Sequence, residues 1–463
     1  MKKAALHNLG CKVNAYETEA MQEMLEKAGY EIVPFKEGAD IYIINTCTVT
    51  NIADRKSRQM LHRARKMNPD AVVVAAGCYV QAQEDKQEVD PCIDIVIGNN
   101  KKQDLVSILK EYEHARQEAG AKTMSTKAET NTGSVLTKPD REEKDSHEGP
   151  CMELIDINHT KEYEELHLSR TGEHTRAYIK VQDGCNQFCS YCIIPYARGR
   201  VRSRRKDDVV AEVRRLAENG YQEVVLTGIH LSSYGIDFEE EEETLLSLIK
   251  AVHEVEGIKR IRLGSLEPRI ITEEFAKAIA SMPKMCPHFH LSLQSGCDAT
   301  LKRMNRRYTS AEYYEKCMLL RKYFDNPALT TDVITGFPGE TEEEFEESRA
   351  FVEKVGFYET HIFKYSKRHG TKAAVMEDQV LEQVKAARSD VLLALNERQR
   401  RRYEESFLGK EVEVLVEEEA ELDGRRVQVG HTKEYMKIAL EGRENLQNCI
   451  VKVEIENDLQ IIH

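Results

Sequence analysis

Short apolar runs alternate with amphipathic stretches along the first 110 residues. The runs predict buried strands at Ala4–Leu9, Ile41–Ile44, Val72–Ala76 and Ile93–Ile97. Between them, apolar residues recur at helical spacing and predict helices at Tyr16–Ala28, Ala53–Met67 and Lys101–Ala115. Strands that alternate with helices are typical of an open, largely parallel α/β sheet.

The same alternation resumes after residue 175. Six strands are predicted, at Arg176–Val181, Glu223–Thr227, Lys259–Leu263, His288–Leu293, Leu329–Ile334 and Glu359–Phe363. Helices are predicted between them, at Asp207–Glu218, Thr244–Val255, Thr272–Ser281, Ser310–Phe324 and Thr341–Val355. Six βα units with right-handed crossovers indicate a partial (β/α)6 barrel.

The rest of the chain differs in pattern. A polar stretch rich in Ser, Thr, Lys and Glu predicts a linker or insertion at 117–170. A charged helix at Gln379–Glu404 ends the barrel region. The last sixty residues predict strands around an Asp423-Gly424 turn, which is a hairpin signal, and so a small β-barrel of OB type. The expected domains are 1–116, the 117–170 linker, 171–403 and 404–463.

Composition narrows the class of protein. The net charge is −14, and no run of eighteen apolar residues is present, so we expect no membrane span. The basic N-terminal tip lacks an apolar signal core, which predicts a cytoplasmic protein. Thiols stay reduced in that compartment, so some of the twelve cysteines are expected to bind metal.

Three cysteines lie in one loop directly after the first barrel strand. Cys185, Cys189 and Cys192 have the spacing CxxxCxxC. Three thiolates from one loop can ligate three irons of a 4Fe–4S cube and leave the fourth iron open. An open iron can chelate the amino and carboxylate groups of S-adenosylmethionine (SAM). A zinc ribbon would repeat its CxxC pair, which this loop does not. The loop therefore predicts a radical-SAM enzyme.

A second cysteine set is scattered along the sequence. Cys11, Cys47 and Cys78 each follow an apolar strand of the N-terminal region. The carboxyl ends of parallel strands lie along one edge of a sheet, so these thiolates can converge on a second cluster. Free cysteine is also among the most buried residue types, and three structural cysteines explain the same pattern. The residues alone leave both interpretations open.

Several motifs resemble the radical-SAM methylthiotransferase family over essentially the whole chain outside the polar linker. They are Gly10–Glu19, Asn45–Val49, Gly77-Cys78, Asp183–Arg200 and Asp332–Thr341. The C-terminal β region resembles the RNA-binding TRAM domain of that family. The resemblance implies that Cys11, Cys47 and Cys78 bind an auxiliary 4Fe–4S cluster whose open iron holds the sulfur to be transferred. It also implies that one SAM methylates this sulfur and that a second SAM yields the 5′-deoxyadenosyl radical.

The remaining cofactor contacts are expected at the strand ends. The resemblance places Tyr191 near the SAM adenine. The other expected SAM-binding residues are Thr227, Gly228, Ser265, Glu267, Gln294, Asp332 and Gly336. Beyond the cluster ligands, no catalytic residue is expected. A low-potential electron donor and a sulfur donor are expected partners.

The substrate is expected from the branch that the motifs resemble. Leu226–Gly235, Arg262–Pro268 and Arg303–Tyr308 resemble the branch that methylthiolates carbon 2 of threonylcarbamoyladenosine, beside the tRNA anticodon at position 37. The alternatives are isopentenyladenosine in tRNA and an aspartate of a ribosomal protein. An alternative of another class is a non-catalytic iron–sulfur or zinc RNA-binding module.

Basic residues near the cysteine loop indicate a nucleic-acid contact. We expect phosphates of the anticodon stem-loop to be neutralised by Arg198, Arg200, Arg202, Arg204, Arg205 and Lys206. We also expect one of Arg262, Arg303, Arg306 and Arg307 to meet the carboxylate of the threonyl arm.

Overall fold

The computed structural model describes residues 1–82, 90–129, 151–170, 175–239, 243–422, 424–442, 445–457 and 460–463, with only the backbone of 119–129. The chain forms two compact units. Unit 1 comprises Met1–Thr160 and Glu164–Leu166, and unit 2 comprises Lys161–Tyr163 and His167–His463. No helix among the described residues is both long and apolar enough to cross a bilayer.

Unit 1 is built on a six-stranded parallel sheet of order β2-β1-β3-β4-β5-β6. Its strands are β1 (Lys3–Asn8), β2 (Glu31–Ile32), β3 (Ile41–Thr46), β4 (Val72–Gly77), β5 (Ile95–Ile97) and β6 (Cys151–Glu153). The four predicted strands are present. Every residue of β3 and β4 is buried, because helices cover both faces of the central strands. The edge strand β6 comes from the range that the sequence assigned to a linker.

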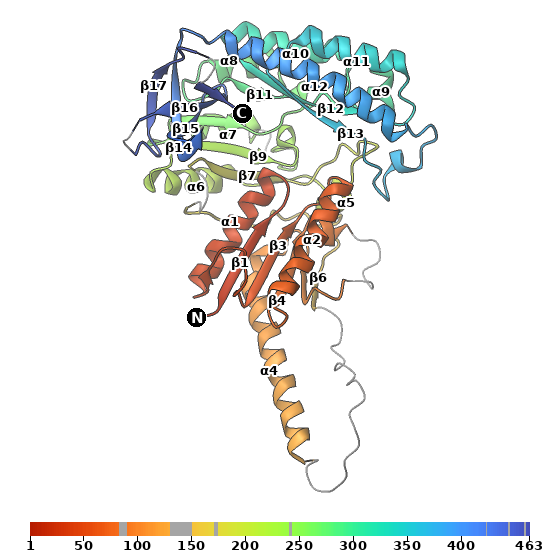
Figure 1. The fold of residues 1–463 in the computed structure, drawn as a ribbon, viewed down its shortest axis with the longest axis vertical. Helices are drawn as coiled ribbons and strands as arrows, with labels where there is room; N and C mark the ends of the chain where they lie inside the picture. Colours follow the sequence, from red (N-terminus) through yellow and green to blue (C-terminus); the bar gives the residue numbers. More distant parts are fainter. Residues whose placement is uncertain are drawn as a thin grey trace. The chain divides into compact units, whose positions relative to one another are not determined.

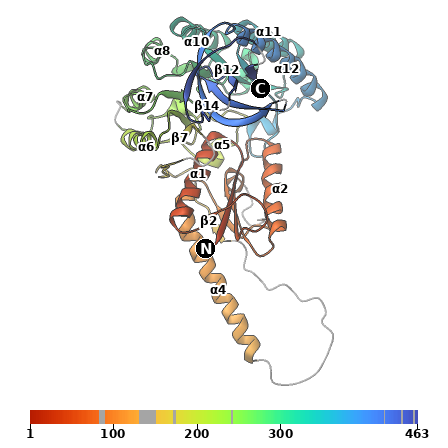
Figure 2. The same ribbon diagram turned by 60° about the vertical axis from the view of Figure 1, so that its left-hand side comes forward.

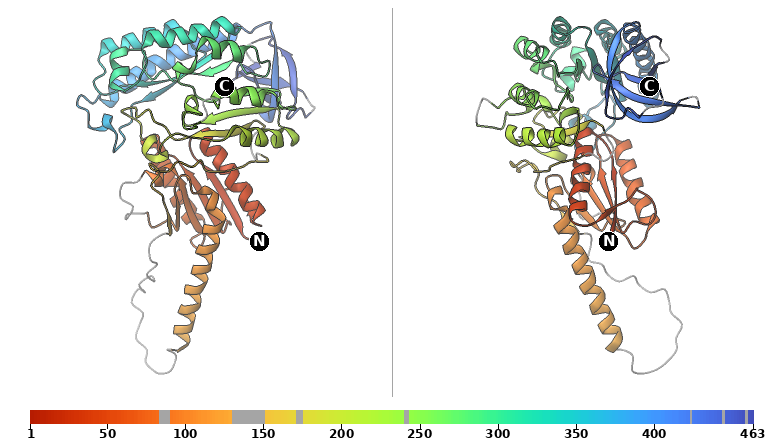
Figure 3. Two further views of the ribbon diagram at one scale, coloured as in Figure 1. Left: turned by 180° about the vertical axis from the view of Figure 1, so that it is seen from behind. Right: turned by 90° about the vertical axis from the view of Figure 1, so that its left-hand side faces the viewer.

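Helices pack on both faces of this sheet (Figure 1). They are α1 (Lys12–Lys27), α2 (Asn51–Met67), the short α3 (Cys78–Gln81) and α4 (Leu105–Glu129). Residues of α1 and α4 share one apolar cluster with alternate strand residues, and those of α2 share the cluster on the opposite face. The helix α4 ends at Glu129, beyond the predicted end at Ala115 (Figure 3).

Unit 2 contains the predicted βα units. The strands form two groups, ordered β10-β9-β7-β8 and β11-β12-β13, which parallel bridges such as Leu266–Leu291 connect. The short β8 (Arg202–Ser203) pairs antiparallel with β7. The parallel strands are β7 (Ala177–Asp183), β9 (Glu223–Gly228), β10 (Arg260–Leu263), β11 (His288–His290), β12 (Ala328–Thr335) and β13 (Glu359–Lys364). The main helices between and after them are α6 (Lys206–Glu218), α7 (Leu245–His253), α8 (Glu273–Ala280), α10 (Ser310–Tyr323), α11 (Glu342–Val355) and α12 (Glu382–Glu405). The predicted partial barrel is confirmed.

The barrel strands divide their side chains between two environments. Ile179, Val181 and Leu226 point into the apolar core that the strands share with the helices. Residues next to them in sequence, such as Lys180 and Thr227, are polar and nevertheless buried. This alternation gives the barrel an apolar outer layer and a polar inner face, where polar ligands can be bound.

The C-terminal residues form an antiparallel sheet of order β17-β14-β15-β16-β18, which curves strongly in Figure 2. Its strands are β14 (Glu411–Leu422), β15 (Arg425–Thr432), β16 (Lys437–Glu441), β17 (Ile450–Glu454) and β18 (Ile461–Ile462). The hairpin β14–β15 forms where the sequence predicted it; Asp423 lies outside the described residues. Its register shifts between Val416 and Glu418.

Candidate active site

The predicted cluster loop leaves β7 at its carboxyl end. Cys185 N–H donates to Gly199 O (3.0 Å) and Cys192 N–H to Cys189 O (3.0 Å), so the loop folds back on itself before α5 (Ile194–Arg198). Gly184 has φ +69°, and a Cβ there would lie 1.8 Å from the carbonyl oxygen of Arg200. Glycine is therefore required one residue before the first cysteine.

Hydrogen bonds from other barrel loops hold the cysteine loop in place. The Ser190 hydroxyl donates to Arg303 O (2.8 Å), and Ser190 N–H donates to Met304 O (3.0 Å). Ala373 N–H donates to Ser190 O (2.7 Å), and the Asn305 amide donates to Phe188 O (2.9 Å). These bonds fix the loop backbone without using the thiols, which leaves the thiols available to a metal.

The guanidinium of Arg306 is a cationic neighbour of the thiols. Its Nη1 donates to Cys189 Sγ (3.3 Å), and its Nε donates to the Tyr308 hydroxyl (2.9 Å). Burial raises the pKa of Cys185 to about 11 and the pKa of Cys192 to about 12. Both thiols therefore stay protonated at neutral pH until a metal displaces the protons. A guanidinium beside a thiolate offsets part of the negative charge that a thiolate-ligated cluster brings.

The predicted SAM-binding residues lie at the carboxyl ends of successive strands. Thr227 and Gly228 end β9, Ser265 and Glu267 follow β10, Gln294 follows β11, Gly336 follows β12, and Asp332 lies within β12. A Cβ at Gly228 would lie 2.8 Å from the side-chain oxygen of Gln182, so glycine lets β9 approach β7 closely. Tyr191 packs edge-to-face on Phe337, with ring centroids 6.3 Å apart. The carboxyl ends of barrel strands are where such folds bind ligands.

His230 lies in the Leu226–Gly235 motif, and the sequence predicted no role for it. Its N–H donates to the side-chain oxygen of Gln182 (2.7 Å), whose own amide donates to Gly184 O (2.8 Å) beside the cluster loop. His230 Nδ1 lies 2.7 Å from the Ser233 hydroxyl, whereas His230 Nε2 is buried without a hydrogen-bond partner among the described residues. Burial, and then the charge of Arg306, lower its pKa to about 4, so the ring is neutral. An orphaned buried nitrogen at this edge fits a polar ligand.

The second cysteine set lies at one edge of the sheet in unit 1. Asn8 of β1 pairs with Asn45 of β3, and Thr46 of β3 pairs with Gly77 of β4. Cys47 and Cys78 therefore follow paired positions on adjacent strands. Cys11 precedes α1, and a Cβ at its neighbour Gly10 would lie 2.9 Å from Cys47 Sγ.

Amide side chains support this edge. Asn14 Nδ2 donates to Leu9 O (2.7 Å) and Thr46 O (3.0 Å), which joins the turn before Cys11 to the end of β3. Asn99 Nδ2 donates to Cys78 Sγ (3.6 Å). Glycine at the close approach, together with an N–H directed at a sulfur, fits a thiolate-ligated cluster better than three unrelated cysteines.

The basic run after the cysteine loop contributes less surface charge than the sequence suggested. Arg198 and Arg202 are buried beside the Asp183 carboxylate, at 3.1 and 3.8 Å, and Arg204 is buried beside Glu212 at 2.8 Å. These three arginines neutralise acids of the same chain and are not available to phosphates. Of the predicted RNA-binding residues, Arg200 and Arg205 are exposed and Lys206 is partly exposed.

The four arginines expected to include a carboxylate ligand have different environments. Arg262 is fully buried near the amino ends of the strands, where it donates to Glu223 (2.8 Å) and to Lys433 O (2.9 Å). Arg303 is paired with Glu344. Arg262 is thus a structural residue, whereas Arg306 lies at the cluster loop and Arg307 is exposed.

Another polar group lies on the inner face of the barrel. His290 Nε2 is 3.2 Å from the Asp332 carboxylate, and the ring of His361 stacks on His290 at 5.6 Å. A ligand atom of each lies within 4.8 Å of the others. The Thr330 hydroxyl lies 3.0 Å from His290 Nδ1. Asp332, predicted to contact SAM, is thus also paired with a histidine inside the barrel.

Known families match both units. Residues 179–352 match the Radical SAM superfamily, and residues 3–98 match the Uncharacterized protein family UPF0004. The threonylcarbamoyladenosine tRNA methylthiotransferase MtaB of Bacillus subtilis is 40% identical over 98% of this chain and 94% of its own length. The chain belongs to the radical-SAM tRNA methylthiotransferase family. It is accordingly an enzyme that transfers a sulfur-containing group, and this family uses SAM and a 4Fe–4S cluster.

Other relatives carry two different substrate names. A protein of Aquifex aeolicus with the same MtaB name is 38% identical over 97% of this chain and 99% of its own length. A tRNA-2-methylthio-N(6)-dimethylallyladenosine synthase of Oceanobacillus iheyensis is 34% identical over 98% of this chain and 82% of its own. Among solved structures, the radical SAM methyltransferase TsrM of Kitasatospora setae matches with TM-score 0.53, 16% identity, and coverage of 81% of this chain and 74% of that chain. That likeness supports the fold.

Proposed function

We propose that the chain methylthiolates carbon 2 of threonylcarbamoyladenosine at position 37 of tRNA. The observation that carries this proposal is the 40% identity, over nearly the full length of both chains, to a relative named for that substrate. Relatives named for dimethylallyladenosine reach 33 to 35%. The loop after β9, which includes His230, also resembles the threonylcarbamoyl branch.

We further propose that the chain holds two 4Fe–4S clusters. Cys185, Cys189 and Cys192 would bind the one that reduces SAM, and Cys11, Cys47 and Cys78 would bind the auxiliary one. Bound clusters supply electron transfer to SAM and an open iron for sulfur. The chain's own residues position the groups around them. Arg306 donates to Cys189, and Asn99 donates to Cys78. Burial of Cys47 and Cys78 limits the access of water to these thiols.

The tRNA contact is proposed to involve the C-terminal sheet as a TRAM domain, together with the accessible Arg200, Arg205 and Lys206. A low-potential electron donor and a sulfur donor complete the reaction. Because tRNA is the proposed substrate, the proposed location is the cytoplasm.

A competition assay tests the substrate. The reconstituted enzyme receives equal amounts of tRNA bearing threonylcarbamoyladenosine and tRNA bearing isopentenyladenosine, and the methylthiolated nucleosides are quantified by mass spectrometry. We expect the threonylcarbamoyl product to dominate by at least about tenfold, a difference of roughly 1.4 kcal/mol in transition-state stabilisation. Preferential modification of the isopentenyl tRNA would contradict the proposed substrate but would still agree with methylthiolation as the reaction.

An iron count separates the enzyme from a non-catalytic module. Two cubes require about eight irons per chain after anaerobic reconstitution. A zinc protein with no 5′-deoxyadenosine production would overturn both the clusters and the activity.

A further inference from the structure

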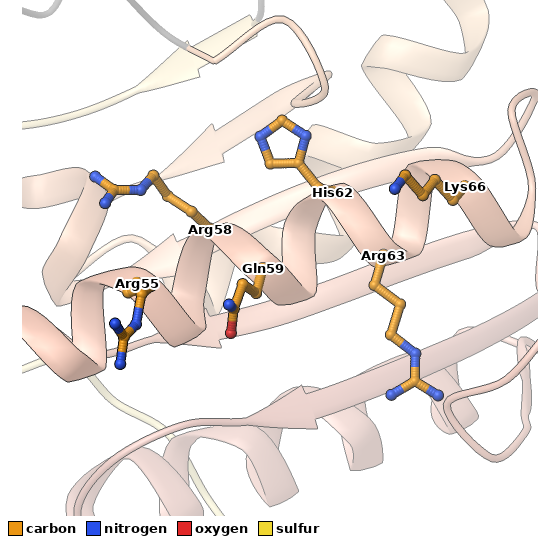
Figure 4. Close-up of a pocket in the computed structure, with 6 residues that line it drawn as sticks. All are labelled: Arg55, Arg58, Gln59, His62, Arg63 and Lys66. Atoms are coloured by element: carbon orange, nitrogen blue, oxygen red, sulfur yellow. The ribbon is translucent and has the colours of Figure 1, made fainter.

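The helix α2 of unit 1 carries a stripe of cations that the catalytic site does not use. Arg55, Arg58, Arg63 and Lys66 are exposed and line one surface hollow together with Gln59 and His62 (Figure 4). Their spacings of three, four, seven, eight and eleven residues place all six on one side of the helix. We propose that this stripe, defined as these six residues, binds the phosphate backbone of tRNA. The inference rests on the proposed function.

The opposite side of α2 explains why the stripe faces outward. Leu61 and Ala64 are fully buried in the core against the sheet, and Ser57 is buried as well. These residues fix the rotation of the helix about its axis. The cations are therefore held on the surface by core packing.

Among the residues that the structure describes, little negative charge balances the stripe. In the described part of the chain, none of Arg55, Arg58, Arg63 and Lys66 makes an ion pair or a side-chain hydrogen bond. The one acid of α2, Asp54, accepts a hydrogen bond from the Thr48 hydroxyl (2.7 Å), and His62 pairs with Asp90 at 2.8 Å. The protein as a whole carries a net charge of −14, so the stripe is a local exception.

This arrangement disfavours the isolated helix. Arg55 and Arg58 are like charges three residues apart, and so are Arg63 and Lys66. Each like-charge pair of this kind opposes helix formation. A polyanion bound along the stripe would attract these cations and so offset the repulsion between them.

A nucleic-acid backbone fits the stripe better than an acidic protein does. The stripe extends over three helical turns, roughly 16 Å, and consists of charged and polar side chains. Protein interfaces place aromatic and aliphatic residues at their centre, and the stripe has none. Phosphate contacts, in contrast, are made mainly by arginine and lysine.

The position of α2 connects the stripe to the second cysteine site. The Ser57 hydroxyl donates to Cys47 O (3.1 Å), and Cys47 N–H donates to Ser57 Oγ (3.2 Å). One helix thus holds both the stripe and the backbone of a proposed cluster ligand. Phosphates bound to the stripe would position the RNA relative to Cys47.

The test compares two variants that remove the same charge. The stripe variant is Arg58→Gln, Arg63→Gln and Lys66→Gln, and the control is Lys36→Gln, Lys110→Gln and Lys250→Gln at exposed positions elsewhere. Binding of the full-length reconstituted protein to labelled tRNA is measured by fluorescence anisotropy at several salt concentrations. The unfolding midpoint and the iron content of both variants are required to match the parent.

We expect the stripe variant to bind tRNA on the order of a hundredfold more weakly at about 0.1 M salt. The slope of log K against log salt should fall by about two units, because each lost phosphate contact contributes about 0.7 to 0.9. The control should stay within about threefold of the parent. A charge-preserving variant, Arg58→Lys, Arg63→Lys and Lys66→Arg, should bind as the parent does, because phosphate contacts of this type depend mainly on charge.

Two outcomes overturn the inference. If the parent binds and modifies tRNA while the stripe variant matches the control, the stripe has no role in RNA binding and the proposed function is unaffected. If the parent itself neither binds nor modifies tRNA, the proposed function fails and the inference fails with it.

Discussion

Replacing Gly184 with alanine tests whether the cysteine loop depends on one close backbone approach. The native residue has φ +69°, a left-handed conformation that disfavours an L side chain by about 1 to 2 kcal/mol. The new Cβ would lie 1.8 Å from Arg200 O and 2.4 Å from Arg200 C, so backbone has to move. Overpacking of this kind adds about 1 to 3 kcal/mol. We therefore expect a loss of about 2 to 5 kcal/mol in the free energy of unfolding.

Gly409→Ala is the matched control. Gly409 has φ +72°, and no atom lies within 4 Å of the point that a Cβ would occupy. Only the conformational part of the loss applies there, about 1 to 2 kcal/mol. Urea unfolding of both variants gives the difference, and iron content with 5′-deoxyadenosine production reports on the loop. We expect Gly184→Ala to lose both readouts, since Cys185 is displaced with its neighbour. Equal stability of the two variants, with parental iron in Gly184→Ala, would show that the loop does not depend on this close approach.

Three further predictions concern the two clusters, the packing of Tyr435 against Arg262, and the dependence of stability on pH. Cys47→Ala should stop methylthiolation and spare 5′-deoxyadenosine production, whereas Cys185→Ala should abolish both; methylthiolated product from Cys47→Ala at the parental rate would contradict the sulfur-carrying role. Tyr435→Ala should lower the free energy of unfolding by about 1 to 3 kcal/mol, measured as a lower urea midpoint. The reason is that the ring lies 4.8 Å from the buried Arg262 guanidinium and stacks on His288. An unchanged midpoint would show that this contact adds no stability. Burial raises the pKa of Glu404 to about 7, so its charged form destabilises the fold increasingly as the pH rises from about 4.5 to 7. Glu404→Gln should therefore stabilise the protein by up to about 3 kcal/mol at pH 8 and have little effect at pH 4. An equal effect at both pH values would contradict the raised pKa.

Buried arginines of the barrel donate hydrogen bonds to the C-terminal sheet. Arg260 donates to Glu413 O (2.7 Å) and His431 O (2.9 Å), and Arg262 donates to Lys433 O. Removing the sheet would take away these backbone acceptors and leave Glu223 of β9 as the partner of both cations, so part of their hydrogen-bonding capacity would be unsatisfied. Weak tRNA binding by a truncated chain would therefore report on barrel stability as well as on RNA contacts.

Features that depend on residues close together along the chain could be predicted from the sequence. The spacing of Cys185, Cys189 and Cys192 is local, so their common loop was evident from the chain alone. The runs at β3 and β4 are apolar throughout because both faces of the sheet are covered, and this pattern identifies a buried parallel strand. The barrel strands were equally recognisable, since helices separate them at regular intervals.

Tertiary structure alone decided which distant residues meet. The run from Arg198 to Lys206 indicated an RNA surface, yet three of its arginines are buried beside Asp183 and Glu212, partners that a run of like charges does not reveal. Strand register, set by packing of whole strands, brings the end of β3 beside that of β4 and so places Cys47 next to Cys78. Ion pairing and register depend on contacts between residues far apart in sequence. The strand pattern indicated that Cys47 and Cys78 could share a sheet edge, but it did not determine which strands are neighbours or which acids pair with the arginines.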